Sequence, residues 1–455
     1  MEIENYSKEI QVLLKKNKIS IGDVVRIIKD ENVYEGIFMP RPELGDDNCF
    51  VIKISSGYNI GISYEKGVRI EKSKKPEPKQ IKEEVKFEFE KEKIKELKFD
   101  PKKPKVALIM TGGTIISRVD YRTGGVYALE KPEELLTNIP ELKNIVNIEN
   151  ILTPFQKMSE DLDYRDWQKL AELAAKELNK NEGVIIAHGT DTLHFTSAAL
   201  SFMLKNPSKP VVFVGSQRSS DRGSSDAFMN LICSAHAAIS NIAEVGVCMH
   251  GTTNDDYCNF IRGTKVRKMH STRRDAFRSI NEMPLAKIWP DGRIETTNKN
   301  HRNRSDEKVV ADVKFEPKIA LLKTYPGSEP EILEFLVKKG YKGFVLEGTG
   351  LGHVPTFAEK SWLPAIKKLI KDGIPVVVAT QTIYGRINPN VYTNLRKLYH
   401  EAKAIPAEDM LPETAYVKLG YVLGHAKDLD KVRELMLTNL AGEITERSEI
   451  ETFLV

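Results

Sequence analysis

From Lys105 onward, short apolar runs alternate regularly with longer amphipathic stretches. Residues 164–179, for example, place Trp167, Leu170 and Leu178 on one face at helical spacing. Alternating strands and helices predict an α/β core, a parallel sheet with helices on both faces. The strands are expected at residues 106–110, 184–187, 211–214, 245–249, 319–322, 344–346 and 376–379. The helices are expected at residues 164–179, 192–204, 226–239, 329–339, 361–371 and 412–423.

A small β domain is expected in front of this core, at residues 1–72. Ile10, Leu13 and Leu14 lie on one helical face and predict a short helix at residues 6–15. Five short β-rich runs separated by turn residues follow, which is typical of a small SH3-like or Sm-like barrel. Such barrels bind RNA, proteins or nothing, so this fold alone does not give a function. The strands are expected at residues 23–28, 33–39, 49–54, 59–63 and 67–70.

Two polar stretches divide the rest of the chain. Residues 73–103 are rich in Lys and Glu and predict a charged linker, with one possible strand at residues 85–90. Residues 298–307 are expected to separate a large α/β domain at 104–307 from a smaller one at 308–455.

The composition disfavours several classes of protein. With 68 basic and 64 acidic residues the charge is nearly balanced, so binding to nucleic acid would need a local basic patch. The apolar runs are shorter than the ~18–20 residues of a membrane helix, and the N-terminus shows no secretory signal. Cys49, Cys233, Cys248 and Cys258 form no Cys-x-x-Cys pair. We therefore expect a cytoplasmic protein that has no disulfide framework, no metal site and no contact with a membrane.

Four of the expected strands end in loops rich in Gly, Thr, Ser and Asp. Ligands bind beyond the carboxyl ends of parallel strands, where glycine lets the backbone approach the ligand and offer N–H groups to negative charge. A hydroxyl group beside such donors is a candidate nucleophile. The four loops begin at Thr111, His188, Gly215 and His250.

Each of these signals also has a plainer interpretation. A Gly-Gly-Thr or Gly-Thr-Asp-Thr segment after a strand can simply be a turn that caps the next helix. A phosphate-binding loop is disfavoured, because neither the Gly-x-x-x-x-Gly-Lys spacing nor a complete Gly-x-Gly-x-x-Gly fingerprint is present. Lys268 stands among Lys265, Arg267, Arg273 and Arg274, so a solvated basic face is a serious alternative for it.

Together the loops resemble the paired threonine motifs of the L-asparaginase/glutaminase family, and the resemblance extends over the α/β core. The first motif is present as Thr-Gly-Gly-Thr-Ile at 111–115, and the second as His-Gly-Thr-Asp-Thr at 188–192. Residues 215–230 resemble a third family segment. Residues 267–277 resemble the segment with the family's catalytic lysine, and residues 159–161 occupy the place of its substrate-carboxylate serine. The resemblance implies an asparaginase-like, two-lobed α/β fold.

The resemblance also implies a role for each site residue. Thr114 would attack a side-chain amide carbon to form an acyl-enzyme, and Lys268, in its neutral form, would draw a proton from Thr190. Asp191 would bind the α-ammonium group of the substrate, and Ser159 its α-carboxylate. The chain would thus release ammonia from a small amino-acid amide.

Other positions near these motifs are expected to contact the substrate. Gly113 and Gly189 lie in the two threonine loops, and backbone N–H groups near Gly113 and Thr190 are candidates for an oxyanion hole. Glu160 replaces the glutamine that is common in the family, and its carboxylate could pair with the ammonium group of the substrate.

Further expectations concern a lid over the site, a neighbouring subunit and two histidines. Tyr121 and Tyr127 flank a segment that resembles the family's mobile lid, and either could be the lid tyrosine. Leu351 stands where many asparaginases carry an asparagine that reaches the site of a neighbouring subunit. His188 and His250 follow strands but have no metal-ligand spacing, so we expect them to act as hydrogen-bonding residues.

The first 103 residues set this chain apart from free asparaginases, whose first threonine motif lies close to the N-terminus. A β domain and charged linker in this place resemble the glutaminase subunits of archaeal glutamyl-tRNA(Gln) amidotransferases, and this resemblance covers the entire chain. It implies that glutamine is hydrolysed to supply ammonia for the conversion of Glu-tRNA(Gln) to Gln-tRNA(Gln).

The same resemblance implies partners. A kinase/amidotransferase subunit would bind the tRNA, ATP and Mg, leaving no cofactor on this chain, and a homodimer of the chain would sit inside a heterotetramer. Two alternatives stay open: a stand-alone L-asparaginase, and a non-catalytic RNA- or protein-binding protein.

Overall fold

A computed structural model describes most of the chain. The described residues are 3, 5–41, 46–54, 59–73, 99–113, 117–119, 126–128, 139–149, 151–219 and 224–454, with only the backbone given at 117–119 and 126–128. The strand expected at 85–90 lies outside them. The chain separates into two compact units. One comprises residues 1–97, 114–138 and 218–227, and the other comprises residues 98–113, 139–217 and 228–455.

The N-terminal domain is a five-stranded antiparallel sheet with one helix. Its strands have the order β4-β3-β2-β1-β5, and neighbouring strands pair in antiparallel register. Side chains of the helix and the strands, including Ile10, Leu14 and Phe50, form a core of their own. A closed barrel would also need β4 to pair with β5, and the described residues form no such pairing. The elements are α1 (Lys8–Lys16), β1 (Val24–Lys29), β2 (Asn32–Phe38), β3 (Cys49–Lys53), β4 (Asn59–Ser63) and β5 (Arg69–Lys72).

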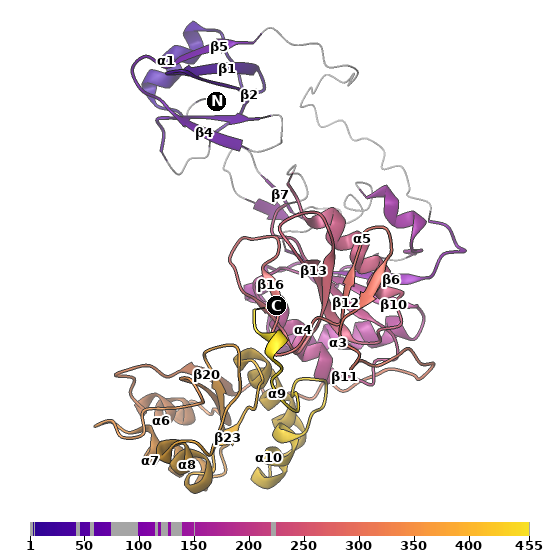
Figure 1. The fold of residues 1–455 in the computed structure, drawn as a ribbon, viewed down its shortest axis with the longest axis vertical. Helices are drawn as coiled ribbons and strands as arrows, with labels where there is room; N and C mark the ends of the chain where they lie inside the picture. Colours follow the sequence, from indigo (N-terminus) through magenta and orange to yellow (C-terminus); the bar gives the residue numbers. More distant parts are fainter. Residues whose placement is uncertain are drawn as a thin grey trace. The chain divides into compact units, whose positions relative to one another are not determined.

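The first lobe of the core is built on an eight-stranded sheet of order β18-β17-β14-β13-β12-β10-β6-β9 (Figure 1). From β9 to β13 the strands are parallel, as expected from the alternation of strands and helices. From β14 to β18 they are antiparallel, so the sheet is mixed. The strands are β6 (Val106–Met110), β9 (Ile151–Leu152), β10 (Gly183–Ala187), β12 (Val211–Val214), β13 (Val245–His250), β14 (Cys258–Arg262), β17 (Ala286–Ile288) and β18 (Ile294–Thr296).

The described residues of this lobe include the helices α3 (Tyr164–Leu178), α4 (Leu193–Met203) and α5 (Ala227–Ala238). Helix α3 begins at a capping box, in which the Asp163 and Asp166 side chains each accept a hydrogen bond from a backbone N–H group of the first turn. Trp167, Leu170 and Leu178 of α3 are buried in the core of the lobe, as their spacing predicts.

The second lobe holds a smaller parallel sheet of order β20-β21-β22-β23. Its strands are β20 (Ile319–Lys323), β21 (Gly343–Gly348), β22 (Val376–Thr380) and β23 (Ile405–Pro406). Its helices are α6 (Glu331–Lys338), α7 (Trp362–Lys371), α8 (Thr393–Arg396), α9 (Pro412–His425) and α10 (Leu429–Leu437).

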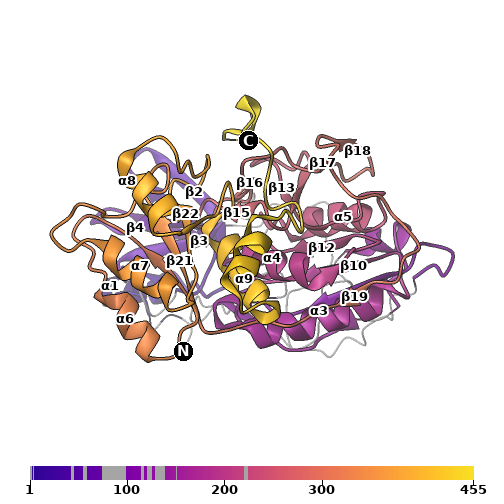
Figure 2. The ribbon, with the colours of Figure 1, turned by 90° about the horizontal axis from the view of Figure 1, so that it is seen from below.

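Helix α9 belongs to the hydrophobic cores of both lobes. Val417 and Tyr421 lie in the core of the first lobe, whereas Leu419 and Val422 lie in a core of the second. Figure 2 shows α9 alongside α4 of the first lobe, and the two helices are in contact. The two lobes therefore share a buried helix.

The chain stays on the first lobe beyond the polar stretch at 298–307. Strand β19 (Val310–Ala311) pairs with β11 (Leu204–Lys205), which directly follows α4. The Arg304 side chain within that stretch donates hydrogen bonds to the carbonyl oxygens of Ser240 and Glu182. The polar stretch is thus fastened to the first lobe by its own side chains.

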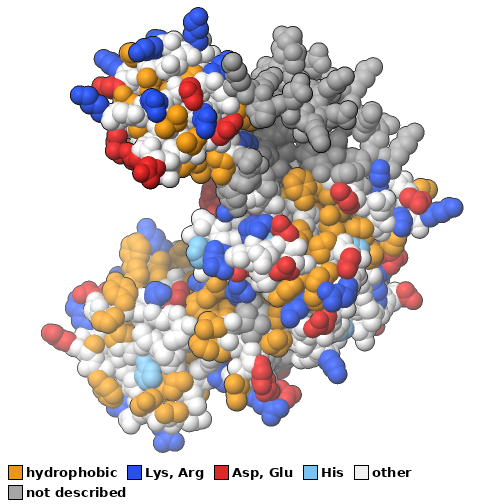
Figure 3. All heavy atoms as spheres, turned by 45° about the horizontal axis from the view of Figure 1, so that its top comes forward, with side chains coloured by type: hydrophobic (Ala, Val, Ile, Leu, Met, Phe, Trp, Pro, Cys, Tyr) orange, Lys and Arg blue, Asp and Glu red, His pale blue; other side chains and the backbone are white. Residues whose placement is uncertain are grey.

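Charge is distributed evenly on the face drawn in Figure 3, where basic and acidic side chains are interspersed. In the part of the chain that the structure describes, no helix is both long and apolar enough to cross a membrane.

Deletion of residues 1–103 should leave the α/β core folded. The N-terminal domain packs its apolar side chains into a cluster that runs from Tyr6 to Ile70, whereas β6 opens the core of the first lobe at Ala107. We expect cooperative thermal unfolding of the truncated chain, measured by circular dichroism, at a Tm close to that of the full chain. A truncated chain without a cooperative transition would contradict this separation of the two cores.

Candidate active site

The two threonine motifs lie side by side at the carboxyl edge of the first sheet. Strands β6 and β10 are parallel neighbours, with Met110 opposite Ala187, so the loops that follow them are adjacent. The backbone N–H and the Oγ1 hydroxyl of Thr111 both donate to the Ala187 carbonyl oxygen, at 3.0 and 3.1 Å. Thr114 lies just outside the described residues, after Gly113.

Glycine is required where these loops meet. Gly113 has a φ of +87°, and a Cβ atom there would lie 2.4 Å from Gly189 Cα. A Cβ atom on Gly189 would in turn lie 2.8 Å from Ser159 Cβ. The two backbones are therefore in direct contact, and Gly113, Gly189 and Ser159 come together as the sequence predicts.

Ser159 is buried against the second threonine loop. It begins the 3-10 helix η3 (Ser159–Asp161), and its hydroxyl accepts a hydrogen bond from the backbone N–H of Thr192 at 3.4 Å. Its carbonyl oxygen accepts a hydrogen bond from the Thr192 hydroxyl at 2.6 Å. Glu160 is exposed on the same turn. Ser159 therefore lies against the second threonine loop, and Glu160 follows it on the same turn.

Lys268 reaches the second threonine loop from a short hairpin, β15 (Val266–Lys268) and β16 (Phe277–Ser279). Its Nζ lies 2.9 Å from Thr190 Oγ1 and 2.6 Å from Asp191 Oδ1. The Lys268 side chain is 11% exposed and that of Asp191 is 66% exposed, so the amine is shielded while the carboxylate faces solvent. The solvated basic face is thus the wrong interpretation for Lys268.

The third loop packs against Thr190. A Cβ atom on Gly215 would lie 2.8 Å from Thr190 Cγ2, so the third loop also approaches the site closely. The Gly215 carbonyl oxygen accepts a hydrogen bond from Asn230 Nδ2 at 2.9 Å. Asn230 Oδ1 lies 2.5 Å from Nδ1 of the buried His250, which confirms a hydrogen-bonding role for this histidine.

Two buried histidines flank the cluster. His188 Nδ1 donates to the Gly189 carbonyl oxygen at 2.7 Å, and burial lowers the pKa of His188 to about 4. Burial, followed by the charges of Arg267 and Lys268, lowers the pKa of His194 to about 3. Both rings are therefore neutral near pH 7. His194 lies outside the five-residue second motif, and no sequence pattern singled it out.

The expected lid segment lies largely outside the described residues, whereas Leu351 lies within them. Strands β7 (Ser117–Val119) and β8 (Val126–Ala128) form an antiparallel hairpin around the expected lid segment. Tyr121 lies outside the described residues, and only the backbone of Tyr127 is described. Leu351 packs partly buried against the core of the second lobe.

No group of three or more His, Cys, Asp or Glu side chains within the described ranges is arranged to hold a metal ion. The described part of the site offers hydroxyl, amine and carboxylate groups together with backbone N–H donors. This set suits acyl transfer through a threonine ester.

Three protein families match successive parts of the chain. Residues 19–72 match the GatD N-terminal domain, residues 105–302 match the N-terminal asparaginase domain, and residues 318–436 match the glutaminase/asparaginase C-terminal domain. Among solved structures, the thermostable L-asparaginase from Thermococcus kodakarensis superposes with a TM-score of 0.66 at 31% identity. It covers 75% of this chain and 100% of its own, which confirms the asparaginase fold.

Several relatives that match nearly the full length of this chain have the same name. The D subunit of the glutamyl-tRNA(Gln) amidotransferase of Pyrococcus abyssi is 52% identical over 98% of this chain and 99% of the relative. The D subunits from Pyrococcus furiosus and Methanothermobacter thermautotrophicus are 52% and 43% identical over 98% and 99% of this chain, and over 100% and 99% of their own lengths. The chain therefore belongs to the family of glutamyl-tRNA(Gln) amidotransferase D subunits, with an asparaginase fold behind an N-terminal antiparallel β domain.

Proposed function

We propose that this chain hydrolyses glutamine to glutamate and ammonia as the glutaminase subunit of a tRNA-dependent amidotransferase. The observation that carries the proposal is the contact of Lys268 Nζ with both Thr190 Oγ1 and Asp191 Oδ1. An amine so placed can exchange a proton with a hydroxyl group while a carboxylate holds it in position. The membership in the D-subunit family identifies the amide as that of glutamine.

The proposed reaction has two steps, the formation of a threonine ester and its hydrolysis. Thr114 Oγ attacks the side-chain amide carbon, the C–N bond breaks, and the hydroxyl proton leaves with the nitrogen as ammonia. A water molecule then opens the threonine ester and restores the Thr114 hydroxyl. Lys268, acting through Thr190, carries the protons between these steps.

The remaining site residues bind and orient the substrate in this proposal. Asp191 is the exposed carboxylate of the cluster and suits the α-ammonium group, with Glu160, next to Ser159 in the sequence, as a second carboxylate. The Ser159 hydroxyl suits the α-carboxylate. Backbone N–H groups of the loops at Gly113 and Gly189 would stabilise the oxyanion of the tetrahedral intermediates.

Ammonia made at this site needs an acceptor on another protein. The sequence has no recognisable ATP-binding loop, and its charge is nearly balanced. We therefore propose that a partner subunit binds Glu-tRNA(Gln), ATP and Mg, and that two copies of this chain assemble with two partners in the cytoplasm.

Substitution of the nucleophile should abolish glutamine hydrolysis in a folded protein. Thr114→Val removes the attacking oxygen at nearly constant volume, so ammonia release should fall by several orders of magnitude. Thr196→Val is a matched control, because the Thr196 hydroxyl is buried without a hydrogen-bond partner in the described structure. Turnover in Thr114→Val equal to that of the control would remove Thr114 from the mechanism.

Replacement of Lys268 by arginine should be nearly as damaging as its removal. A guanidinium group keeps the positive charge but cannot accept a proton near neutral pH, so kcat should drop by at least ~100-fold. Lys287→Arg serves as the control, because Lys287 is not one of the site residues. It lies on β17 with its Nζ 5.3 Å from the centre of the Tyr257 ring, a cation–π contact that arginine can also make. Normal turnover in Lys268→Arg would leave Lys268 only an electrostatic role.

Glutaminase activity should depend on the rest of the complex. An enzyme that supplies ammonia to another active site wastes glutamine when it works alone, so we expect low turnover that rises when the partner holds Glu-tRNA(Gln) and ATP. Ammonia release from glutamine and from asparagine is measured for the chain alone, with its partner, and with partner, tRNA and ATP. Equal rates in all three states, with asparagine preferred, would support a stand-alone asparaginase instead.

A further inference from the structure

Strand β15, which carries Lys268, is tied to the second lobe by two ion pairs. Lys265, just before the strand, places its Nζ 2.6 Å from Asp409 Oδ2, and both side chains are fully buried. Arg267, the neighbour of Lys268 within the strand, places Nη1 2.5 Å from Glu413 Oε1. Both acidic partners come from the segment of the second lobe that leads into α9 or from its first turn.

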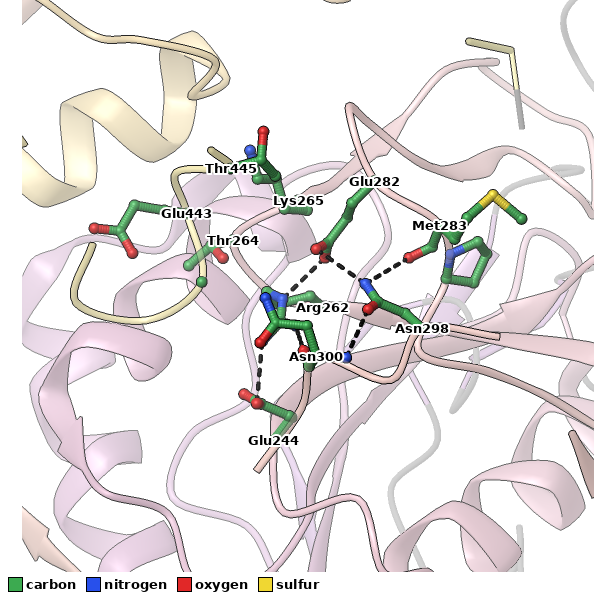
Figure 4. A network of polar contacts seen from close by, with 12 residues as sticks. Glu244, Arg262, Thr264, Lys265, Glu282, Met283, Asn298, Asn300, Glu443 and Thr445 are labelled. Atoms are coloured by element: carbon green, nitrogen blue, oxygen red, sulfur yellow. Dashed lines mark hydrogen bonds and ion pairs between the residues drawn. The ribbon is translucent and has the colours of Figure 1, made fainter. Parts of the chain in front are cut away.

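The first of these pairs is part of a dense anchor. Asp409 Oδ1 accepts a hydrogen bond from the Thr445 backbone N–H at 3.0 Å, and its carbonyl oxygen accepts one from Asn281 Nδ2 at 3.0 Å. The turn before Lys265 is fixed as well, because Arg262 lies between Glu244 and Glu282 at 3.0 and 2.9 Å (Figure 4). The start of β15 is therefore immobilised from both lobes.

The second pair has a different character. Glu413 is buried in the first turn of α9, and burial raises the pKa of its carboxyl group while the charge of Arg267 opposes that rise. Its second oxygen, Oε2, has no hydrogen-bond partner in the described structure. The carboxyl group also interacts with its own backbone N–H, and its contact with Arg267 is an ion pair of 2.5 Å in which Arg267 Nη1 makes no hydrogen bond in the described structure. A buried carboxylate paired in this way calls for a reason.

The strand geometry supplies that reason. Side chains alternate along a β-strand, so Arg267 points to the side of β15 opposite to Lys268. When Glu413 holds Arg267 on one side, the backbone between them is fixed and Lys268 projects on the other side toward Thr190 and Asp191. Helix α9 is a rigid support for this hold, because it is buried in the cores of both lobes.

We propose that Glu413 is a positioning residue which, through Arg267, aims Lys268 of the first lobe at Thr190 from the second lobe. The proposal rests on the proposed function, in which Lys268 transfers protons. A lysine side chain is long and flexible, so its Nζ keeps two contacts at once only if its backbone is held. A displacement of this backbone by about 1 Å is enough to impair proton transfer by up to ~100-fold.

Two other roles for Glu413 make different predictions. A carboxylate in the first turn of a helix favours the helix dipole, and an ion pair between two lobes adds general stability. Either role would lower the Tm in Glu413→Gln without a specific effect on catalysis. Neither role would make the effect of Glu413→Gln on kcat depend on whether Arg267 is present.

The test is a double-mutant cycle in the full chain with its partner, Glu-tRNA and ATP. Glu413→Gln and Arg267→Met should each lower kcat for glutamine by about 10- to 100-fold with little change in KM, and the double variant should lower it no further. Glu182→Gln is the matched control: it breaks an ion pair with Arg304 of 3.0 Å within the first lobe and should keep wild-type kcat. Additive losses, or losses that follow the Tm, would overturn the positioning role.

A second measurement does not depend on glutamine. The rate at which an amine-reactive reagent labels Lys268 is followed by peptide mass spectrometry in the folded wild type, Glu413→Gln and Glu182→Gln. We expect faster labelling of Lys268 only in Glu413→Gln, since loss of the hold frees an amine that is otherwise shielded. Unchanged labelling together with normal kcat would overturn the positioning role and leave the proposed function intact. Changed labelling in a protein that never hydrolyses glutamine would keep the positioning role and overturn the function.

Discussion

The arrangement of the core depends on charged side chains that are buried where its two lobes meet. Lys265–Asp409 and Lys418–Glu443 are ion pairs of 2.6 and 2.5 Å whose four side chains are fully buried. Burial lowers the pKa of Lys418, and the charge of Glu443 opposes that shift. Removing one partner of such a pair costs about 3–5 kcal/mol, because the other charge stays buried alone. These pairs therefore admit one packing of α9 and of the segment after α10 against the first lobe.

This constraint bears on the chemistry, although the described site residues lie on the first lobe. The loops after β6, β10 and β12 make close contacts that leave no room for a Cβ atom, as at Gly113, Gly189 and Gly215. Lys268 lies on a strand of three residues that, among the residues the structure describes, pairs with β16 and not with the large sheet. Its position depends on side-chain contacts, and several of these come from the second lobe.

Much of the architecture could be predicted from local patterns in the sequence. Most of the parallel strands and helices of both lobes follow from the alternation of apolar runs with amphipathic stretches, and the threonine loops fall at strand ends as that pattern requires. The two-residue strands β9 and β23 and the helices α8 and α10 were not predicted. The antiparallel strands β14, β17 and β18 were not predicted. No helices lie between them, so the alternation that marks the parallel strands is absent there.

The sequence by itself determined which residue types could make an acyl-transfer site and which strands would present them. Only the tertiary structure decided that Lys268, far along the chain from Thr190, places its amine 2.9 Å from that hydroxyl instead of in solvent among its basic neighbours. Glu413, Asp409 and His194 belong to no motif, because their roles come from burial and from partners distant in sequence. A motif identifies the functional groups of a loop. The direction of a flexible side chain depends on the packing of the lobes that hold its backbone.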